Sequence, residues 1–532
     1  MLRKTIVFTT KFSLILVFSF LLVFSIQPHL LTGETRSLDK QPLFDGLGNH
    51  HFSIATQSVE AQKYFDQGIV LTYAFNHAEA FKSFQAAAQL DPSCAMCYWG
   101  MSYVLGPNIN VPMAESANEL AWEMLQKAVD LSNQVSAKER KYIQALSRRY
   151  EPDYQEDRSQ LNEEYAVAMR RLVQEYPNDL NAKTLFAEAL MDTMPWNYWT
   201  ENGAPKPKTV EVIDTLKTVI RRDPDNPGAL HLLIHAVEAQ EPELAIEAAD
   251  HLRDLNINAG HLIHMPSHIY LRVGRYRDAI VANEKAADAD LEYAKTRNLE
   301  GVYPLGYMPH NHNFLWYSAA IAGQEKIAIA AATAAADLVE TSLIREPGFA
   351  GTLQHYSILP LYAAVRFGQW NKILSIKSPD ADLSYPVGVW HFARGMAFAD
   401  SKDRLEEAKQ ELEALKANAS DRALEGIKIC GRADAADLLN IAAAVLAGTI
   451  AEKQENYPEA IAYLRDGVTI EDSLIYAEPS AWYRPVRQLL GNVLLSAKKP
   501  EQAEVVFRED LEKYPRNRWS LYGLYRSLLR HI

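Results

Sequence analysis

The sequence predicts an all-α fold, a right-handed superhelical α-solenoid assembled from consecutive helix pairs. Three observations lead to this fold class. Hydrophobic residues make up 48% of the 532 residues and are spread evenly, which suits an extended array better than one globule. No segment alternates convincingly at the two-residue period of a strand. Small and aromatic residues also recur at a spacing of about 34 residues, the length of one helix pair in a repeat protein.

The first and last repeats carry this spacing most completely. In the frame 61–94, the eighth, 20th, 24th, 27th and 32nd positions hold Gly68, Ala80, Phe84, Ala87 and Pro92. In the frame 484–517, the eighth, 20th, 24th and 32nd positions hold Gly491, Ala503, Phe507 and Pro515. These residues resemble the tetratricopeptide signature closely. The resemblance implies stacked antiparallel helix pairs with a concave groove that binds ligands.

A third frame, residues 260–293, departs from the signature at one position. It keeps small or aromatic residues at five expected places, Ser267, Gly274, Tyr276, Ala279 and Ala286. Asn283 replaces the usual aromatic residue, so we expect this repeat to pack differently. A His-rich central repeat followed by the C-terminal run 519–523 (Trp-Ser-Leu-Tyr-Gly) resembles a group of exported bacterial tetratricopeptide proteins. That resemblance implies a fold and no particular reaction.

The N-terminus has the pattern of an export signal. Arg3, Lys4 and Lys11 precede an uncharged apolar run over 12–26, which is shorter than the ~20 residues that span a bilayer comfortably. We expect residues 1–33 to be a signal peptide, with an uncleaved N-terminal anchor as the alternative, and the protein to be periplasmic or extracellular. No later segment is expected to span a membrane.

The rest of the chain divides by its repeats and its histidine content. A polar lead-in over 34–57 is expected to precede N-terminal repeats over 58–200, central His-rich repeats over 201–345 and C-terminal repeats over 346–532. The 54 basic and 67 acidic residues give a net charge of -13 with no basic tract, which excludes nucleic acid as a partner. Of three cysteines, Cys94 and Cys97 are close enough to form a local disulfide or a pair of buried thiols.

Nine of the 15 histidines lie between His231 and His355. In the first group, His231, His235 and Glu238 are separated by four and three residues. At about 100° per residue they fall within roughly 60° of one another on one helix face. Two imidazoles and a carboxylate in that arrangement can serve one metal ion.

A second group, His261, His264 and His268, is separated by three and four residues and again shares one face. Pro266 lies between them and fits only the first turn of a helix without breaking a hydrogen bond. We therefore expect His261 in the turn that precedes the helix.

The repeat length brings the two groups together, because frames starting at Asn226 and Gly260 are 34 residues apart and their first helices should lie side by side. His231 then shares a level with His264, and His235 with His268. A further frame from Pro309 adds a third helix. It places His310 at the level of His261, Asn313 at that of His264 and Tyr317 at that of His268, with His312 one residue from this face.

By resemblance to tetratricopeptide proteins, His261, His264 and His268 should face the concave groove. Arg272, at the 13th position of its repeat, would add a cation for a carboxylate or phosphate. We expect Arg272, Asn313 and Tyr317 to be the residues that bind a small-molecule or peptide ligand there.

The seven converging histidines predict a transition-metal site made of His231, His235, His261, His264, His268, His310 and His312. A donor set rich in imidazole favours zinc, copper, iron or nickel over calcium or magnesium. One function is therefore that of a metal-binding protein, with metal-dependent catalysis left open. The alternative is a non-catalytic scaffold that binds a protein or peptide partner, with histidines that satisfy one another and nearby carbonyls. Glu238 is compatible with three roles: metal ligand, orienter of a histidine, or catalytic acid or base.

Overall fold

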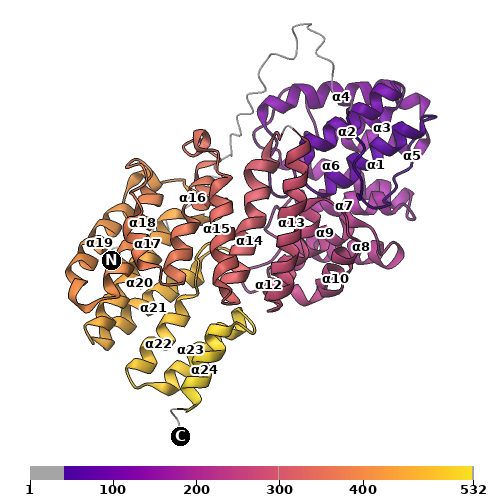
Figure 1. Cartoon of the computed structure of the whole chain (residues 1–532). Coiled ribbons are helices and arrows are strands. Elements are labelled where there is room, and N and C mark those ends of the chain that lie inside the picture. The colour runs from indigo at the N-terminus through magenta and orange to yellow at the C-terminus, as the bar shows by residue number, and fades with distance from the viewer. Residues whose placement is uncertain (1–40, 298, 530–532) are drawn as a thin grey trace, which may run out of the picture.

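A computed structural model describes residues 41–297 and 299–529, and they form a helical array (Figure 1). The expected signal peptide or anchor over 1–33 lies outside the described residues. The N-terminal helices are α1 (Val59–Tyr73), α2 (His77–Leu90), α3 (Ala95–Val104), α4 (Asn118–Leu131), α5 (Ala137–Leu146), α6 (Ser159–Glu175), α7 (Leu180–Asp192) and α8 (Pro207–Arg222). The central helices are α9 (Pro227–Val237), α10 (Ile246–Asp254), α11 (Gly260–His264), α12 (Pro266–Arg272), α13 (Tyr276–Thr296), α14 (Met308–Ile321) and α15 (Glu325–Asp337). The C-terminal helices are α16 (Ala350–Arg366), α17 (Trp370–Ser375), α18 (Ser384–Ala399), α19 (Leu405–Ala419), α20 (Ala435–Lys453), α21 (Tyr457–Ser473), α22 (Val486–Ser496), α23 (Pro500–Lys513) and α24 (Arg518–Leu529).

Helices pack in consecutive pairs, and the pairs pack on their neighbours. Each first helix contacts its partner, as α1 contacts α2 and α20 contacts α21, and first helices of successive pairs such as α16, α18 and α20 also touch. The signature residues allow this closeness. A Cβ added to Gly68 or Gly100 would lie 2.5 Å or 2.6 Å from the ring of Phe84. The fold is therefore an all-α solenoid in which each pair buries its apolar face against the next.

The N-terminal repeats curl so that α1 lies against α9. Asn226 caps α9 by accepting a hydrogen bond from the backbone N–H of Ala229, and Pro227 occupies the first turn. A Cβ on Gly228 would lie 2.6 Å from the ring of Tyr73, so glycine is needed where α9 approaches α1. This curl brings the end of α1 beside the histidines of α9.

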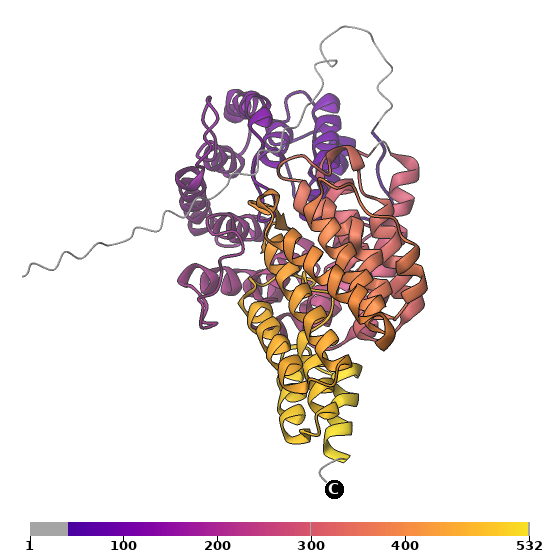
Figure 2. The same ribbon diagram turned by 90° about the vertical axis from the view of Figure 1, so that its left-hand side faces the viewer.

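The C-terminal repeats return to the central ones. The Tyr276 hydroxyl donates a hydrogen bond to the Pro515 carbonyl at 2.8 Å, and Trp519 Nε1 donates to the Ala320 carbonyl at 3.0 Å. Gly274 adopts φ +75°, and a Cβ there would lie 2.3 Å from the Pro515 carbonyl oxygen. Figure 2 shows the yellow C-terminal helices at one end of the molecule, continuing from the orange ones. The C-terminal repeats thus pack directly against the central ones.

Two features differ from the expectations above. Strands β1 (Lys428–Ile429) and β2 (Ala433–Asp434) form a small antiparallel hairpin, too short to show an alternating pattern. The helix α20 is long and apolar enough to cross a membrane by length and composition alone. However, 61% of its apolar window is buried and it packs on α18, α19 and α21, which is the position of a core helix.

Candidate metal centre

Six of the seven predicted histidines come together in two groups of three. The first triplet is His231 and His235 from α9 with His261 from α11; the second triplet is His264 from α11, His268 from α12 and His310 from α14. Within each triplet, the nitrogen atoms able to bind a metal all lie within 4.8 Å of one another. All of these histidines except His310 are at most 2% exposed.

The first triplet presents unpaired ring nitrogens to one position. The Tyr73 carbonyl oxygen lies 2.6 Å from His231 Nδ1, and because a carbonyl only accepts, Nδ1 carries the proton. Glu238 Oε1 lies 2.9 Å from His235 Nδ1 and fixes the same tautomer. Four ring nitrogens are buried and have no hydrogen-bond partner in the described part of the chain: Nε2 of His231, Nε2 of His235 and both nitrogens of His261. Buried polar atoms are normally satisfied, so these converging lone pairs suit a cation.

The second triplet brings two ring nitrogens face to face. His264 Nδ1 lies 2.6 Å from Asn283 Oδ1, and His268 Nδ1 donates a short hydrogen bond to Glu238 Oε2. Both rings then carry their proton on Nδ1, yet His264 Nε2 and His268 Nε2 lie 2.9 Å apart. Two lone pairs repel at that distance, so a cation, either a proton or a metal ion, belongs between them. The ring centroid of His310 is 4.9 Å from that of His264.

Glu238 joins the two triplets. It is fully buried at the C-terminal end of α9, and each of its oxygens accepts from one triplet, Oε1 from His235 and Oε2 from His268. Burial acts to raise the pKa of this carboxyl, but the charge and hydrogen bonds of His268 and His235 hold it well below its usual range. Of the three roles compatible with the sequence, its hydrogen bonds are those of a histidine orienter.

Burial favours the neutral form of four of these imidazoles, as the direction of their pKa shifts shows. It lowers the pKa of His231, His261 and His264 well below the usual value, and lowers the pKa of His310 to about 3. Neighbouring imidazoles add to the effect. Neutral rings are the form that binds metal ions.

A second buried carboxylate, Asp290 in α13, contacts residues next to the triplet histidines. The Tyr303 hydroxyl donates to Asp290 Oδ1 at 2.8 Å and accepts from the backbone N–H of His261 at 3.1 Å. Asn311, which follows the third histidine of the second triplet, donates to Asp290 Oδ2 at 2.7 Å. A Cβ on Gly260 would lie 2.0 Å from Asp290 Oδ1, so only glycine fits there. Burial raises the pKa of Asp290 to about 7.

Each triplet packs against one phenylalanine, which the sequence spacing did not indicate. The ring centroid of Phe75, in the turn after α1, is 4.6 Å from that of His231 and 5.3 Å from that of His261. Phe314 lies 4.5 Å and 4.4 Å from the first two rings of the second triplet. These apolar faces exclude water from the imidazoles.

The repeat spacing predicted two pairs of neighbouring histidines, of which one is confirmed and the other is wrong. The rings of His235 and His268 are adjacent, with centroids 5.2 Å apart. His231 instead packs against His261, at 5.0 Å. His261 is also helical, in α11, and not in a preceding turn, because the chain starts a new helix at Pro266 and leaves α11 intact. That break separates His261 from the second triplet.

Arg272 is not a free cation in the groove. Its Nε donates to the Glu238 carbonyl at 3.1 Å and its Nη2 to the Ala239 carbonyl at 3.2 Å. The guanidinium also lies over the ring of Tyr476, 5.4 Å from its centroid. Arg272 therefore ties α12 to the end of α9.

Three predicted residues of α14 lie outside the triplets. His312 follows His310 by two residues, about 200° around the helix, so it faces away from the other histidines. Among the residues that the structure describes, it belongs to none of the metal-binding groups. Asn313 and Tyr317 are buried, at 4% and 2% exposed, and neither forms a hydrogen bond or ring contact with a triplet within the described ranges.

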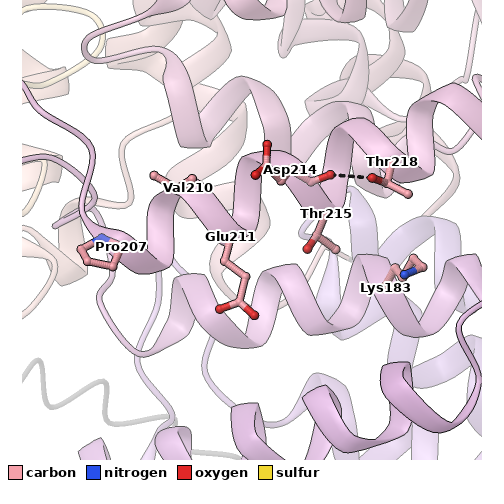
Figure 3. Close-up of a pocket in the computed structure, with 7 residues that line it drawn as sticks. All are labelled: Lys183, Pro207, Val210, Glu211, Asp214, Thr215 and Thr218. Atoms are coloured by element: carbon pink, nitrogen blue, oxygen red, sulfur yellow. Dashed lines mark hydrogen bonds between the residues drawn. The ribbon is translucent and has the colours of Figure 1, made fainter.

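The structure has one cavity away from this centre and another that borders it. Figure 3 shows a shallow depression of about 420 Å³ between α7 and α8, lined by Lys183 and by residues of α8, where the Thr218 hydroxyl donates to the Asp214 carbonyl. No triplet residue lines it. A second cavity of about 230 Å³ is lined partly by Gly260 and Tyr303, so it borders the backbone of the first triplet.

Comparison with known proteins adds little to this geometry. No protein-family model matches the chain, and no curated protein does. Similar solved structures include the APC/C hetero-tetramer Cut9–Hcn1, at 17% identity and a TM-score of 0.31 over 90% of this chain and 78% of that one. Yeast Tom70 is similar at 11% identity and a TM-score of 0.28, over 89% of each chain. Such low values carry no inference about function. On its own helix pairs, repeat spacing and glycine–aromatic packing, the chain has the fold of an all-α solenoid of tetratricopeptide-like helix pairs.

Proposed function

We propose that this protein binds transition-metal ions at its buried histidines, one in each triplet. One observation carries the proposal. The Nε2 atoms of His231 and His235 converge with the ring of His261, and these buried nitrogens have no hydrogen-bond partner among the described residues. A structural role would leave three lone pairs unsatisfied at a cost of about 1–3 kcal/mol each.

The donor chemistry fits a first-row transition metal. Neutral imidazole suits zinc, copper, iron and nickel, whereas calcium and magnesium prefer oxygen ligands. Two donors on one tetrahedral ion, each at ~2.0–2.1 Å, lie roughly 3.3 Å apart, so the 2.9 Å between His264 Nε2 and His268 Nε2 needs little adjustment. Glu238, Asn283 and the Tyr73 carbonyl orient the rings from behind, as partners of metal-bound histidines commonly do.

Three protein ligands per ion favour a catalytic centre over a structural one. Closed structural sites use four ligands, while catalytic sites keep a position open for water or substrate. A bound ion would supply Lewis acidity or, with copper or iron, redox chemistry. The function supported best is thus metal-dependent chemistry on a small ligand inside the solenoid. A peptide-binding scaffold predicts histidines open to water, whereas five of these six are at most 2% exposed.

Export remains part of the proposal. Cys94 and Cys97 are joined by a disulfide at the start of α3, one of the two arrangements expected from their spacing. Disulfides persist in oxidising compartments, which supports a periplasmic or extracellular location.

Elemental analysis of full-length protein purified without a histidine tag tests the proposal. The chain is stripped with chelator and reconstituted with zinc, copper, iron or nickel in turn. We expect about two equivalents of the preferred metal, and about one equivalent in His231→Ala and in His310→Ala, since each variant disables one triplet. The double variant should bind none.

His391→Ala is the matched control. Its Nδ1 lies 2.6 Å from Glu411 Oε2, as His235 Nδ1 lies beside Glu238, but it belongs to neither triplet. It should keep full metal. Less than about a tenth of an equivalent of every metal in the folded wild type would overturn the proposal.

A further inference from the structure

Three segments from distant parts of the chain meet above His235. Asn110 comes from the loop after α3, Trp196 from the loop after α7, and Arg432 from the turn of the β1–β2 hairpin. Trp196 Nε1 donates to Asn110 Oδ1 at 3.0 Å. The Trp196 ring packs edge-on against His235, with centroids 5.2 Å apart. Asn110 is exposed and Trp196 and Arg432 are half-buried, so these three residues lie between His235 and solvent.

The aromatic rings beside His235 are held in a costly backbone conformation. Phe75 has φ 55° and Trp196 has φ 59°, in the left-handed region that bulky side chains rarely adopt. Phe75 stacks on His235 with centroids 6.1 Å apart, whereas Trp196 contacts the same imidazole edge-on. Such conformations cost about 1–3 kcal/mol and concentrate at ligand-binding sites. The chain maintains both of them around the same imidazole.

Arg432 is a cation without a countercharge. Its guanidinium lies over the Trp196 ring, 4.5 Å from the centroid, and forms no ion pair or hydrogen bond with any residue in the described ranges. The Trp196 ring beneath it is the one that packs against His235, which places the guanidinium near the metal centre. Tyr198 packs against the same ring, with centroids 6.3 Å apart. It is 2% exposed, and no described residue accepts a hydrogen bond from its hydroxyl.

Charge balance at the centre requires a negative ligand. Six imidazoles would hold two divalent cations, and the one carboxylate hydrogen-bonded to them is Glu238, within the described residues. Arg432 adds a further positive charge. A buried excess of positive charge is stabilised by an anion.

We propose that Arg432 and Tyr198 bind the carboxylate of a small substrate, beneath Trp196 and beside the open coordination position of the first triplet. The proposal rests on metal binding by that triplet. The planar guanidinium matches a carboxylate through two parallel hydrogen bonds, and the Tyr198 hydroxyl supplies another donor. The half-buried Trp196 ring, which lies under the Arg432 guanidinium, adds an apolar wall that suits a substrate with an apolar body.

Cobalt-loaded full-length protein tests this assignment, with benzoate as the probe and the visible absorption of cobalt as the readout. We expect benzoate to change the spectrum saturably and Arg432→Gln to weaken its binding by about tenfold or more. The benzoate affinity of Arg432→Lys should lie between those of the wild type and Arg432→Gln. Tyr198→Phe should weaken benzoate binding several-fold. Metal content, measured in parallel, should stay at the wild-type value in all three variants.

Arg345→Gln is the control, because this exposed arginine pairs with Asp380 and Asp382 away from the site. It should leave benzoate binding unchanged. Unchanged benzoate affinity in metal-replete Arg432→Gln would overturn the inference while leaving the metal proposal intact. Equal binding of the neutral analogue benzamide, or tighter binding of inorganic phosphate, would also overturn the carboxylate assignment. A wild type that takes no metal would overturn both.

Discussion

The end repeats and the central repeat use the same two positions for different purposes. In the repeat 61–94, the aromatic position holds Phe84, whose ring fills the space between Gly68 and Gly100. In the repeat 484–517, Phe507 fills the same space between two glycines, and a Cβ on either would lie 2.2–2.4 Å from its ring. In both repeats this contact sets how closely three helices approach.

In the central repeat 260–293, these positions hold Ser267 and Asn283. Asn283 Oδ1 lies 2.6 Å from His264 Nδ1, and the Ser267 hydroxyl lies 3.3 Å from the same nitrogen. Asn283 is anchored by donating to the Ala279 carbonyl at 2.7 Å. The packing contact has become a pair of polar groups that orient an imidazole. A departure from a repeat signature can therefore mark the site where a solenoid gains chemistry.

Removing the aromatic contact from an end repeat should have the largest effect on stability. Phe84→Ala and Phe507→Ala each leave a cavity between two glycines, and we expect each to lower the free energy of unfolding by about 3–5 kcal/mol. Urea denaturation followed by circular dichroism measures the loss. Metal content should be unchanged, because neither ring contacts a triplet within the described residues. Loss of metal from a folded Phe84→Ala protein would contradict the division of roles.

The fold could be predicted because it depends on short-range spacing. Gly68, Phe84, Gly491 and Phe507 recur at fixed intervals, and each interval lies within one helix pair or the next. The same arithmetic placed His235 beside His268, which the structure confirms. One contact between adjacent repeats is thus readable from sequence, whereas the predicted pairing of His231 with His264 is wrong.

The rest of the site depends on contacts that no repeat length encodes. The Tyr73 carbonyl reaches His231 across 158 residues because the N-terminal repeats curl back on α9. That curvature results from many small packing angles summed over the array. His261 belongs to the first triplet because the helix breaks before Pro266. The sequence indicated a break near Pro266 but not how the chain turns there. Phe75 and Trp196 gave no signal at all.

The two regions also treat a buried carboxylate differently. Glu238 faces two imidazoles, whereas the side chain of Glu471 in α21 accepts, among the described residues, only from the backbone N–H of Val486, at 2.9 Å. Burial raises the pKa of Glu471 to about 7. The folded protein therefore keeps its proton between pH 4.5 and about 7 while the unfolded chain loses it, so stability falls as the pH rises through this range.

Glu471→Gln should abolish that part of the pH dependence. Relative to the wild type, we expect the variant to gain up to about 3 kcal/mol at pH 8 and to match it near pH 4. Denaturant unfolding at a series of pH values checks the prediction. A wild type that is more stable than Glu471→Gln at pH 8 would show that the carboxylate is ionised and paired in the folded state.

Asn283→Leu tests the polar contact itself, with a smaller expected effect. Leucine is close in volume but cannot accept the proton of His264 Nδ1, so the ring loses its fixed tautomer and orientation. We expect metal affinity at the second triplet to fall about 10–100-fold, measured by chelator competition, while the first triplet is unaffected. Asn517→Leu is the matched control, because Asn517 is equally buried but bonds Asp510 and Ser520 in the C-terminal repeats. It should reduce stability and leave metal affinity unchanged. If Asn283→Leu instead stabilised the protein and kept its metal, the central repeat would be a degraded packing site and not a chemical one.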